Sequence, residues 1–167
     1  TTLLGESLDE PWMAWLSRVE PRDLTRDVSA VLILRHLVDH VWIDSRSAAR
    51  QAQVSEGEAG SVLERLRSAA SEARPLVEAV AGVPESAPPA WTLAPDARRL
   101  LADLDSEAGR QRTAVSRDAL AADFARARGR ISTTELASLA GGHASNMGPA
   151  LRRLEGDGLL EPSVPSR

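Results

Sequence analysis

The sequence predicts a mostly α-helical protein with small β-strands, built from two consecutive units of the same design. When the chain is shifted by 88 residues, one stretch falls on another without a gap. The shift places Ile43 on Ile131, Ala49 on Ala137 and Leu66 on Leu154. Each copy is expected to form a short apolar strand, a capped helix, a turn of small residues and a second helix with an L-x-x-L pattern. That order is typical of a helix-turn-helix inside a winged-helix domain, so we expect two tandem winged helix-turn-helix domains with small β wings.

The amino-acid composition agrees with packed helices and excludes several kinds of site. Hydrophobic residues make up 43% of the chain and charged residues 26%, whereas the aromatic residues are four Trp and one Phe. A core must therefore consist largely of Leu, Val and Ala. The absence of Cys excludes disulfides, thiol nucleophiles and cysteine zinc sites. No apolar run is long enough for a membrane span and no signal-peptide pattern is present, so we expect a cytoplasmic protein without a membrane partner.

Residues 1–22 are predicted to be a connector from a preceding domain, followed by a short helix. Residues 1–4 are β-prone and the chain lacks an initiator Met, which together favour a fragment of a longer protein. Asp9 is expected to cap the helix, with Pro11 in its first turn. Trp12 and Trp15 stand at helical spacing and are interpreted as core or domain-docking residues.

Residues 23–104 are predicted to be the first winged-helix domain. An amphipathic pattern and two capping signals, Asp44 and the Ser55–Glu58 capping box, define its helices. Two β-prone runs on either side of a Gly- and Pro-rich loop are expected to form the wing. The expected elements are helices over 23–40, 45–53 and 55–70, strands over 41–43, 76–80 and 90–93, and a further helix from Pro95 to Leu104.

Residues 105–117 are expected to be a linker or a helix extension, and residues 118–167 a second winged-helix domain with a truncated wing. Gly148 and Pro149 would interrupt its second helix, because proline is tolerated only in a first turn. We therefore expect that helix to begin late, near Asn146, after a longer turn. The expected elements are helices over 118–128, 132–140 and 146–156 and strands over 129–131 and 159–161.

Three segments carry a family resemblance. Residues 89–93 are able to close a first wing, residues 128–132 begin the second repeat, and residues 151–160 combine a leucine-anchored helix, a terminal Gly158 and the start of a strand. With these segments the chain resembles, over nearly its whole length, the C-terminal region of actinobacterial ATP-binding transcriptional regulators of the divergent AAA or Schlafen/AlbA-like type. The resemblance implies transcriptional regulation through DNA binding, with residues 1–5 as the last strand of a preceding domain. It implies ATP binding only in an N-terminal part outside this chain, so no cofactor is expected within it.

The second unit supplies the main candidate contacts with double-stranded DNA. In a helix-turn-helix, the second helix enters the major groove and the preceding helix begins near a phosphate. Asn is able to pair with adenine and Arg with guanine. The candidate base contacts are His143, Ser145, Asn146, Arg152 and Arg153. The candidate phosphate contacts are Thr133 and Thr134, with Arg128 and Arg130 as a basic cluster beside them.

The first unit is less favourable for DNA. Glu56 and Glu58 occupy the start of its second helix, where carboxylates repel phosphate, and the net charge of the whole chain is −4. A secondary set of DNA contacts is Arg46, Arg50, Gln53 and Arg65. The alternative is a structural or homodimer-forming role for this unit, and the sequence leaves both open.

No motif points to an enzyme. His36 and His40 have a metal-binding spacing, but the remaining histidine, His143, belongs to the other unit, so the pair is interpreted as ordinary helix residues. A phosphate-binding loop with its lysine is excluded because the chain has no Lys. Two functions remain: the DNA-binding region of a bacterial transcriptional regulator, or a winged-helix interaction and dimerisation module without DNA contact. The second predicts an apolar patch involving Trp12, Trp15 or Trp42.

Overall fold

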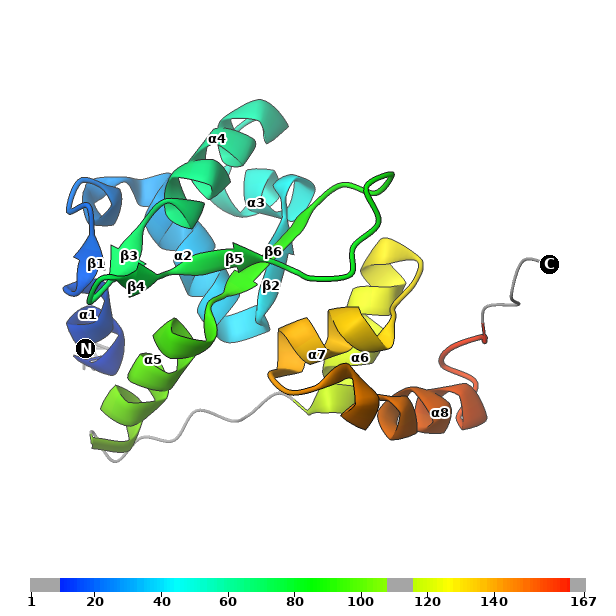
Figure 1. Cartoon of the computed structure of the whole chain (residues 1–167). Helices are drawn as coiled ribbons and strands as arrows, with labels where there is room; N and C mark the ends of the chain where they lie inside the picture. The colour runs from blue at the N-terminus through cyan, green and yellow to red at the C-terminus, as the bar shows by residue number, and fades with distance from the viewer. Residues whose placement is uncertain (1–9, 108–115, 163–167) are drawn as a thin grey trace, which may run out of the picture.

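Two groups of helices lie side by side in the computed structural model, and short antiparallel strands accompany the larger group (Figure 1). The structure describes residues 10–107, here called the first unit, and residues 116–162, the second unit. The chain is thus mostly helical with small antiparallel sheets, as expected. The predictions for the strand at residues 1–5, the cap at Asp9, the middle of the 105–117 segment and the last five residues lie outside the described residues.

The first unit opens with helix α1 (Glu10–Leu16) and a break that the sequence did not predict. The expected helix over 23–40 is a 3₁₀ turn, η1 (Leu24–Arg26), followed by α2 (Val28–His40). Asp27 is extended and its carboxylate accepts hydrogen bonds from the amides of Ser29 and Ala30. An N-cap residue lies outside the helix, so α2 begins at Val28, and this side chain is 71% exposed rather than part of the predicted apolar face.

The capping signals place the next two helices correctly. Strand β2 (Trp42–Asp44) precedes α3 (Ser45–Ala52), and the Asp44 carboxylate accepts from the amide of Ser47. Gln53 takes a left-handed conformation with φ 56° and turns the chain. Ser55 and Glu58 form the predicted capping box of α4 (Glu56–Arg67). Helix α4 stops at Arg67, short of the predicted end at Ala70, because residue 70 enters a strand.

The predicted wing strands are present and pair with β2. Strands β5 (Val77–Ala79) and β6 (Ala90–Leu93) are antiparallel, and the sheet order is β2-β6-β5 with Ile43 opposite Trp91. A second sheet, β1-β3-β4, was not predicted. Its strands are β1 (Val19–Glu20), β3 (Ala70–Ser71) and β4 (Arg74–Pro75). Strands of two residues show no alternation, and the turn at Glu72 and Ala73 reaches positive φ without glycine, so no local signal marked it.

Helix α5 (Pro95–Glu107) continues past Leu104 into the segment that was expected to be a linker or a helix extension. The second unit contains α6 (Arg117–Arg128), α7 (Thr133–Ala140), η2 (Ala144–Asn146) and α8 (Gly148–Gly156). The late start of α8 after a 3₁₀ turn confirms the effect of Gly148 and Pro149. The predicted strands over 129–131 and 159–161 were wrong, because residues 116–162 contain no strand. Neither segment finds a neighbouring strand among the described residues, and an isolated strand has no hydrogen-bond partners.

A shared apolar cluster joins the two units. Trp42, Val80 and Ala90 of the first unit are buried with residues of α6 and α7, which are Leu120, Phe124 and Leu139. The rings of Trp42 and Phe124 meet edge to face at 4.8 Å, and the indole nitrogen of Trp42 donates to the Asp123 carboxylate at 3.0 Å. The second unit therefore completes its core on the first.

Arg98 of α5 fixes this junction from the other side. Its guanidinium donates to the carbonyls of Ser138 and Leu139 at the end of α7, and to the hydroxyl of Thr92 on β6. Burial lowers the pKa of Arg98, and the oxygen ligands together with the negative end of α7 offset that cost. The contact sets the position of α7 relative to the first unit.

In the parts of the chain that the structure describes, no helix combines the length and the apolar character needed to cross a membrane.

Candidate nucleic-acid interface

Helix α8 separates an apolar side from an exposed polar side. Ala150 and Leu154, together with Met147 just before the helix, are buried against the second unit. The predicted base contacts all lie on the exposed side, either on α8 or on the turn before it: His143, Ser145, Asn146, Arg152 and Arg153. All five predicted contacts of this helix and of its preceding turn are therefore exposed.

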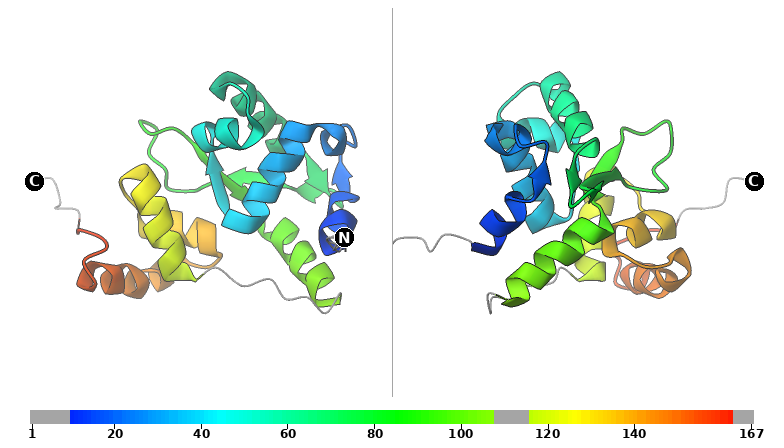
Figure 2. Two further views of the ribbon diagram at one scale, coloured as in Figure 1. Left: turned by 180° about the vertical axis from the view of Figure 1, so that it is seen from behind. Right: turned by 60° about the vertical axis from the view of Figure 1, so that its left-hand side comes forward.

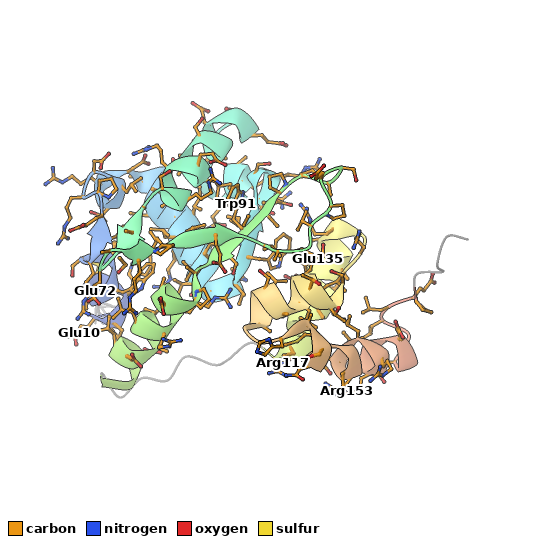
Figure 3. The ribbon with its side chains drawn as sticks, viewed as in Figure 1. Glu10, Glu72, Trp91, Arg117, Glu135 and Arg153 are labelled. Carbon is orange, nitrogen blue, oxygen red and sulfur yellow. The ribbon has the colours of Figure 1, made fainter. Side chains whose placement is uncertain are left out.

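Arg153 is already engaged within the second unit. Its guanidinium binds both carboxylate oxygens of Asp118 on α6, at 3.1 and 2.9 Å. This hydrogen-bonded pair lowers the pKa of Asp118 and raises the pKa of Arg153. Figure 3 shows Arg153 at the lower edge of the molecule, away from helix α4 at the top. Arg152, next in the helix, has no carboxylate within ion-pair distance among the described residues, so it is the more available cation.

The start of α7 lies against the loop between β5 and β6. Ser132 and Glu135 form the predicted capping box there, and Thr133 is half-buried whereas Thr134 is exposed. A Cβ atom at Gly82 would lie 2.9 Å from the Cβ of Thr134. The amide of Ala81 donates to the Ser138 hydroxyl at 3.0 Å. The first unit's loop therefore packs beside Thr134, one of the two predicted phosphate contacts.

The predicted basic cluster does not form one exposed patch. The Arg128 side chain is only 9% exposed, because it points into the junction, where it donates to the carbonyl of Pro88 and lies 3.5 Å from the Asp44 carboxylate. Arg128 therefore lies at the junction of the two units and not on an exposed basic patch, and its role as a DNA contact stays a prediction. Arg130 remains 53% exposed, with its guanidinium 3.7 Å from the Glu135 carboxylate.

The secondary set in the first unit is mostly occupied or flanked by carboxylates. Arg65 is held by Asp27 at 2.7 Å and by Asp23 at 3.5 Å. Arg46 lies 3.8 Å from Glu56, Arg50 donates to the hydroxyl of Ser47, and Gln53 is exposed in the turn after α3.

The exposed side of α4 carries three carboxylates, on Glu56, Glu58 and Glu64, and two arginines in its last turn, Arg65 and Arg67. Helices α4 and α8 also lie at opposite ends of the molecule in every view (Figures 1 and 2). The two helices thus form separate surfaces of different charge.

The two histidine rings of α2, His36 and His40, lie tilted against each other with centroids 4.4 Å apart. Burial, and then the neighbouring His40, lower the pKa of His36. Within residues 10–107 and 116–162, no group of three or more His, Cys, Asp or Glu residues is placed to hold a metal ion.

Sequence reasoning missed the residues that join the units. Arg98, Asp123 and Gly82 acquire their roles from contacts with residues 40 to 81 positions away, so no local pattern marks them. Trp42 was noted as a docking candidate only within an alternative. The one available signal was the scarcity of aromatic residues, because each Trp and Phe then contributes a large share of the apolar area in the core.

The chain matches one family model and has a fold similar to that of one solved structure. Residues 10–102 match the model of a family of unknown function (DUF5635), and the chain belongs to this family. The crystal structure of the DIP2311 protein from Corynebacterium diphtheriae has a similar fold, with a TM-score of 0.68 and 18% sequence identity. The similarity covers 89% of this chain and 26% of that chain, so the present chain spans about a quarter of that protein. No curated protein matches the chain.

Proposed function

We propose that this chain is the DNA-binding region of a bacterial transcriptional regulator and contains two tandem winged helix-turn-helix domains. In the first unit, the succession α2, β2, α3, α4, β5 and β6, with sheet order β2-β6-β5, has the order expected of a winged helix. The second unit repeats the helical part as α6, α7 and α8. The resemblance of residues 89–93, 128–132 and 151–160 to actinobacterial ATP-binding regulators supports the same proposal.

The observation that carries the proposal is the exposed polar side of α8. Asn146 and Arg152 present an amide and a guanidinium, which pair with adenine and guanine in the major groove. Thr133 lies at the start of α7, where a hydroxyl and the helix terminus favour a phosphate. In this proposal the second unit binds double-stranded DNA in the cytoplasm, without enzymatic activity or a cofactor in this chain.

The acidic side of α4 favours a second candidate function for the first unit, namely binding a protein or a second copy of the chain. The apolar Trp patch expected for that function is not exposed, because Trp12, Trp15 and Trp42 are each 8% exposed or less. The charge of α4 and not an aromatic patch is therefore the support for this candidate.

Binding of the chain to a random-sequence 20-base-pair duplex, measured by fluorescence anisotropy at low and moderate salt, tests the proposal. We expect affinity to fall with salt, and Arg152→Ala to weaken binding and to reduce the slope of log affinity against log salt by about one. Arg67→Ala, which removes an exposed arginine from α4, is the matched control and should leave binding unchanged. Equal losses in both variants would show non-specific attraction, and no binding at low salt would favour the interaction module.

A further inference from the structure

A partly open cavity of about 210 Å³ lies at the junction of the two units, away from the exposed side of α8. The start of α3, the loop between β5 and β6, the end of α6 and the start of α7 surround it. Three arginines and three carboxylates line it: Arg46, Arg128, Arg130, Asp44, Glu56 and Glu135. Both units therefore contribute charged groups to one small space.

The ion pairs around this cavity are all long. The nitrogen–oxygen distances are 3.5 Å for Arg128 and Asp44, 3.7 Å for Arg130 and Glu135, and 3.8 Å for Arg46 and Glu56. Charge-assisted hydrogen bonds normally close to about 2.7–2.9 Å. Arg65 with Asp27 and Arg153 with Asp118 reach 2.7 and 2.9 Å in the same molecule. Apart from the Arg128 nitrogen that donates to the Pro88 carbonyl, the arginines at the cavity thus retain donors that their carboxylate neighbours do not satisfy.

Two of the three carboxylates serve the backbone instead. Asp44 accepts from the amide of Ser47 as the cap of α3. Glu135 accepts from the amide of Ser132 in the capping box of α7. The first-turn amides of these helices offset the charge of both carboxylates. The cavity is therefore more favourable for an anion than its equal number of acidic and basic side chains indicates.

We propose that this cavity binds a phosphate-type oxyanion, which Arg46 and Arg130 hold from opposite units and Arg128 approaches from within the junction. The Arg128 side chain is more than nine-tenths buried, so a cation is fixed at the inner wall. Arg46 and Arg130 are 76% and 53% exposed, which leaves them free to turn toward a bound group. The volume is several times the ~30 Å³ of a water molecule, which is enough for a phosphate group.

Such a ligand would bridge the two units. Arg46 belongs to α3 and Arg130 precedes α7, so one oxyanion bound by both would stabilise the docked arrangement by mass action. The phosphate could come from a small phosphorylated molecule or from a DNA backbone, since both present the same oxygens. The site uses neither Asn146 nor Arg152, so it stands or fails independently of the proposed base contacts.

Thermal unfolding of the full chain in inorganic phosphate, against chloride of equal ionic strength, tests the site. We expect a saturable rise in the unfolding temperature, and at least a tenfold weaker apparent affinity for phosphate in the double variant Arg46→Gln/Arg130→Gln. Both side chains are exposed, so the variant should fold, and Arg128 is left in place. The matched control Arg22→Gln/Arg26→Gln removes two exposed arginines elsewhere and should keep the wild-type response.

Equal stabilisation of wild type and double variant, or no effect of phosphate beyond that of chloride, would overturn the proposal. The 20-base-pair duplex then distinguishes the sources of phosphate. If phosphate binds and the double variant keeps its affinity for the duplex, the ligand is a small oxyanion. If the double variant loses duplex affinity and phosphate competes with the duplex, the ligand is the DNA backbone.

Discussion

The helix pair α3–α4 and the helix pair α7–α8 share one design but present different chemistry. In the 88-residue repeat, Arg152 of α8 corresponds to Glu64 of α4. Asn146, in the turn before α8, corresponds to Glu58 of α4. Both pairs bury apolar residues at matching positions, as with Leu66 and Leu154. The buried side is constrained by packing, whereas the exposed side is free to change charge. The repeat therefore defines a common scaffold but not a common partner.

The two pairs also differ in what supports them. In the first unit, β2 is hydrogen-bonded to β6, and Ile43 is fully buried. The corresponding residues 130–132 have no paired strand, and Ile131 is only half-buried. The second unit instead shares its Phe124 cluster with Trp42, Val80 and Ala90. The second unit therefore relies on the first for part of its core, and we expect the two units to unfold together.

The largest loss of stability is expected from removing the Arg98 guanidinium, which joins the two units. Arg98→Met leaves the carbonyls of Ser138 and Leu139 without their donor, and we expect a loss of about 3 kcal/mol in the free energy of unfolding. Urea denaturation followed by Trp fluorescence and by circular dichroism measures it. Arg99→Met, at an exposed neighbour, is the control. Two separate transitions in the wild type would contradict the dependence of one unit on the other.

A smaller loss of stability, of similar size in both units, is expected when either capping box is disrupted. Ser55→Ala and Ser132→Ala each remove the hydroxyl that accepts from the third helical amide, at a cost of about 1 kcal/mol. If the units unfold as one, both variants should shift the same urea midpoint by similar amounts. Ser61→Ala, on the exposed side of α4, is the control. A shift confined to one spectroscopic probe would show that the units unfold separately.

The smallest effect is expected in the pH dependence of the first unit. Hydrogen bonds from the hydroxyl and the amide of Ser55 lower the pKa of Glu58. A lowered pKa in the folded state means that the stabilisation is present above the unfolded pKa and is lost as the pH falls through the folded one. Glu58→Gln should therefore flatten the decline of stability in acid, measured by urea midpoints from pH 6 downward. Glu85→Gln in the exposed loop should keep the wild-type slope, and equal slopes in all three proteins would contradict the prediction.

Local signals predicted most helices but not their assembly. The caps at Asp44, Ser55 and Ser132 place their helices because a side chain bonds to an amide two or three residues away. The break at Asp27 was missed because its flanking residues continue the apolar periodicity. The second-unit strands were predicted from β-prone residues, although strand formation also requires a partner.

For the candidate interface, the sequence identified which side chains of α8 are exposed, because exposure follows from helical periodicity. It misplaced Arg128, because nothing near that residue reveals Asp44 and the Pro88 carbonyl opposite it. The DNA contacts on α8 and at the start of α7 stay predictions.

By itself, the sequence determined most helices, the caps at Asp44, Ser55 and Ser132, the repeat and the chemical contrast between α4 and α8, since these depend on neighbours within a few residues. Only the tertiary structure decided that Arg98, Trp42 and Phe124 join the units, and that arginines from both units line one cavity. The reason is that burial and ion pairing depend on groups brought together from distant parts of the chain, whose approach no local pattern specifies.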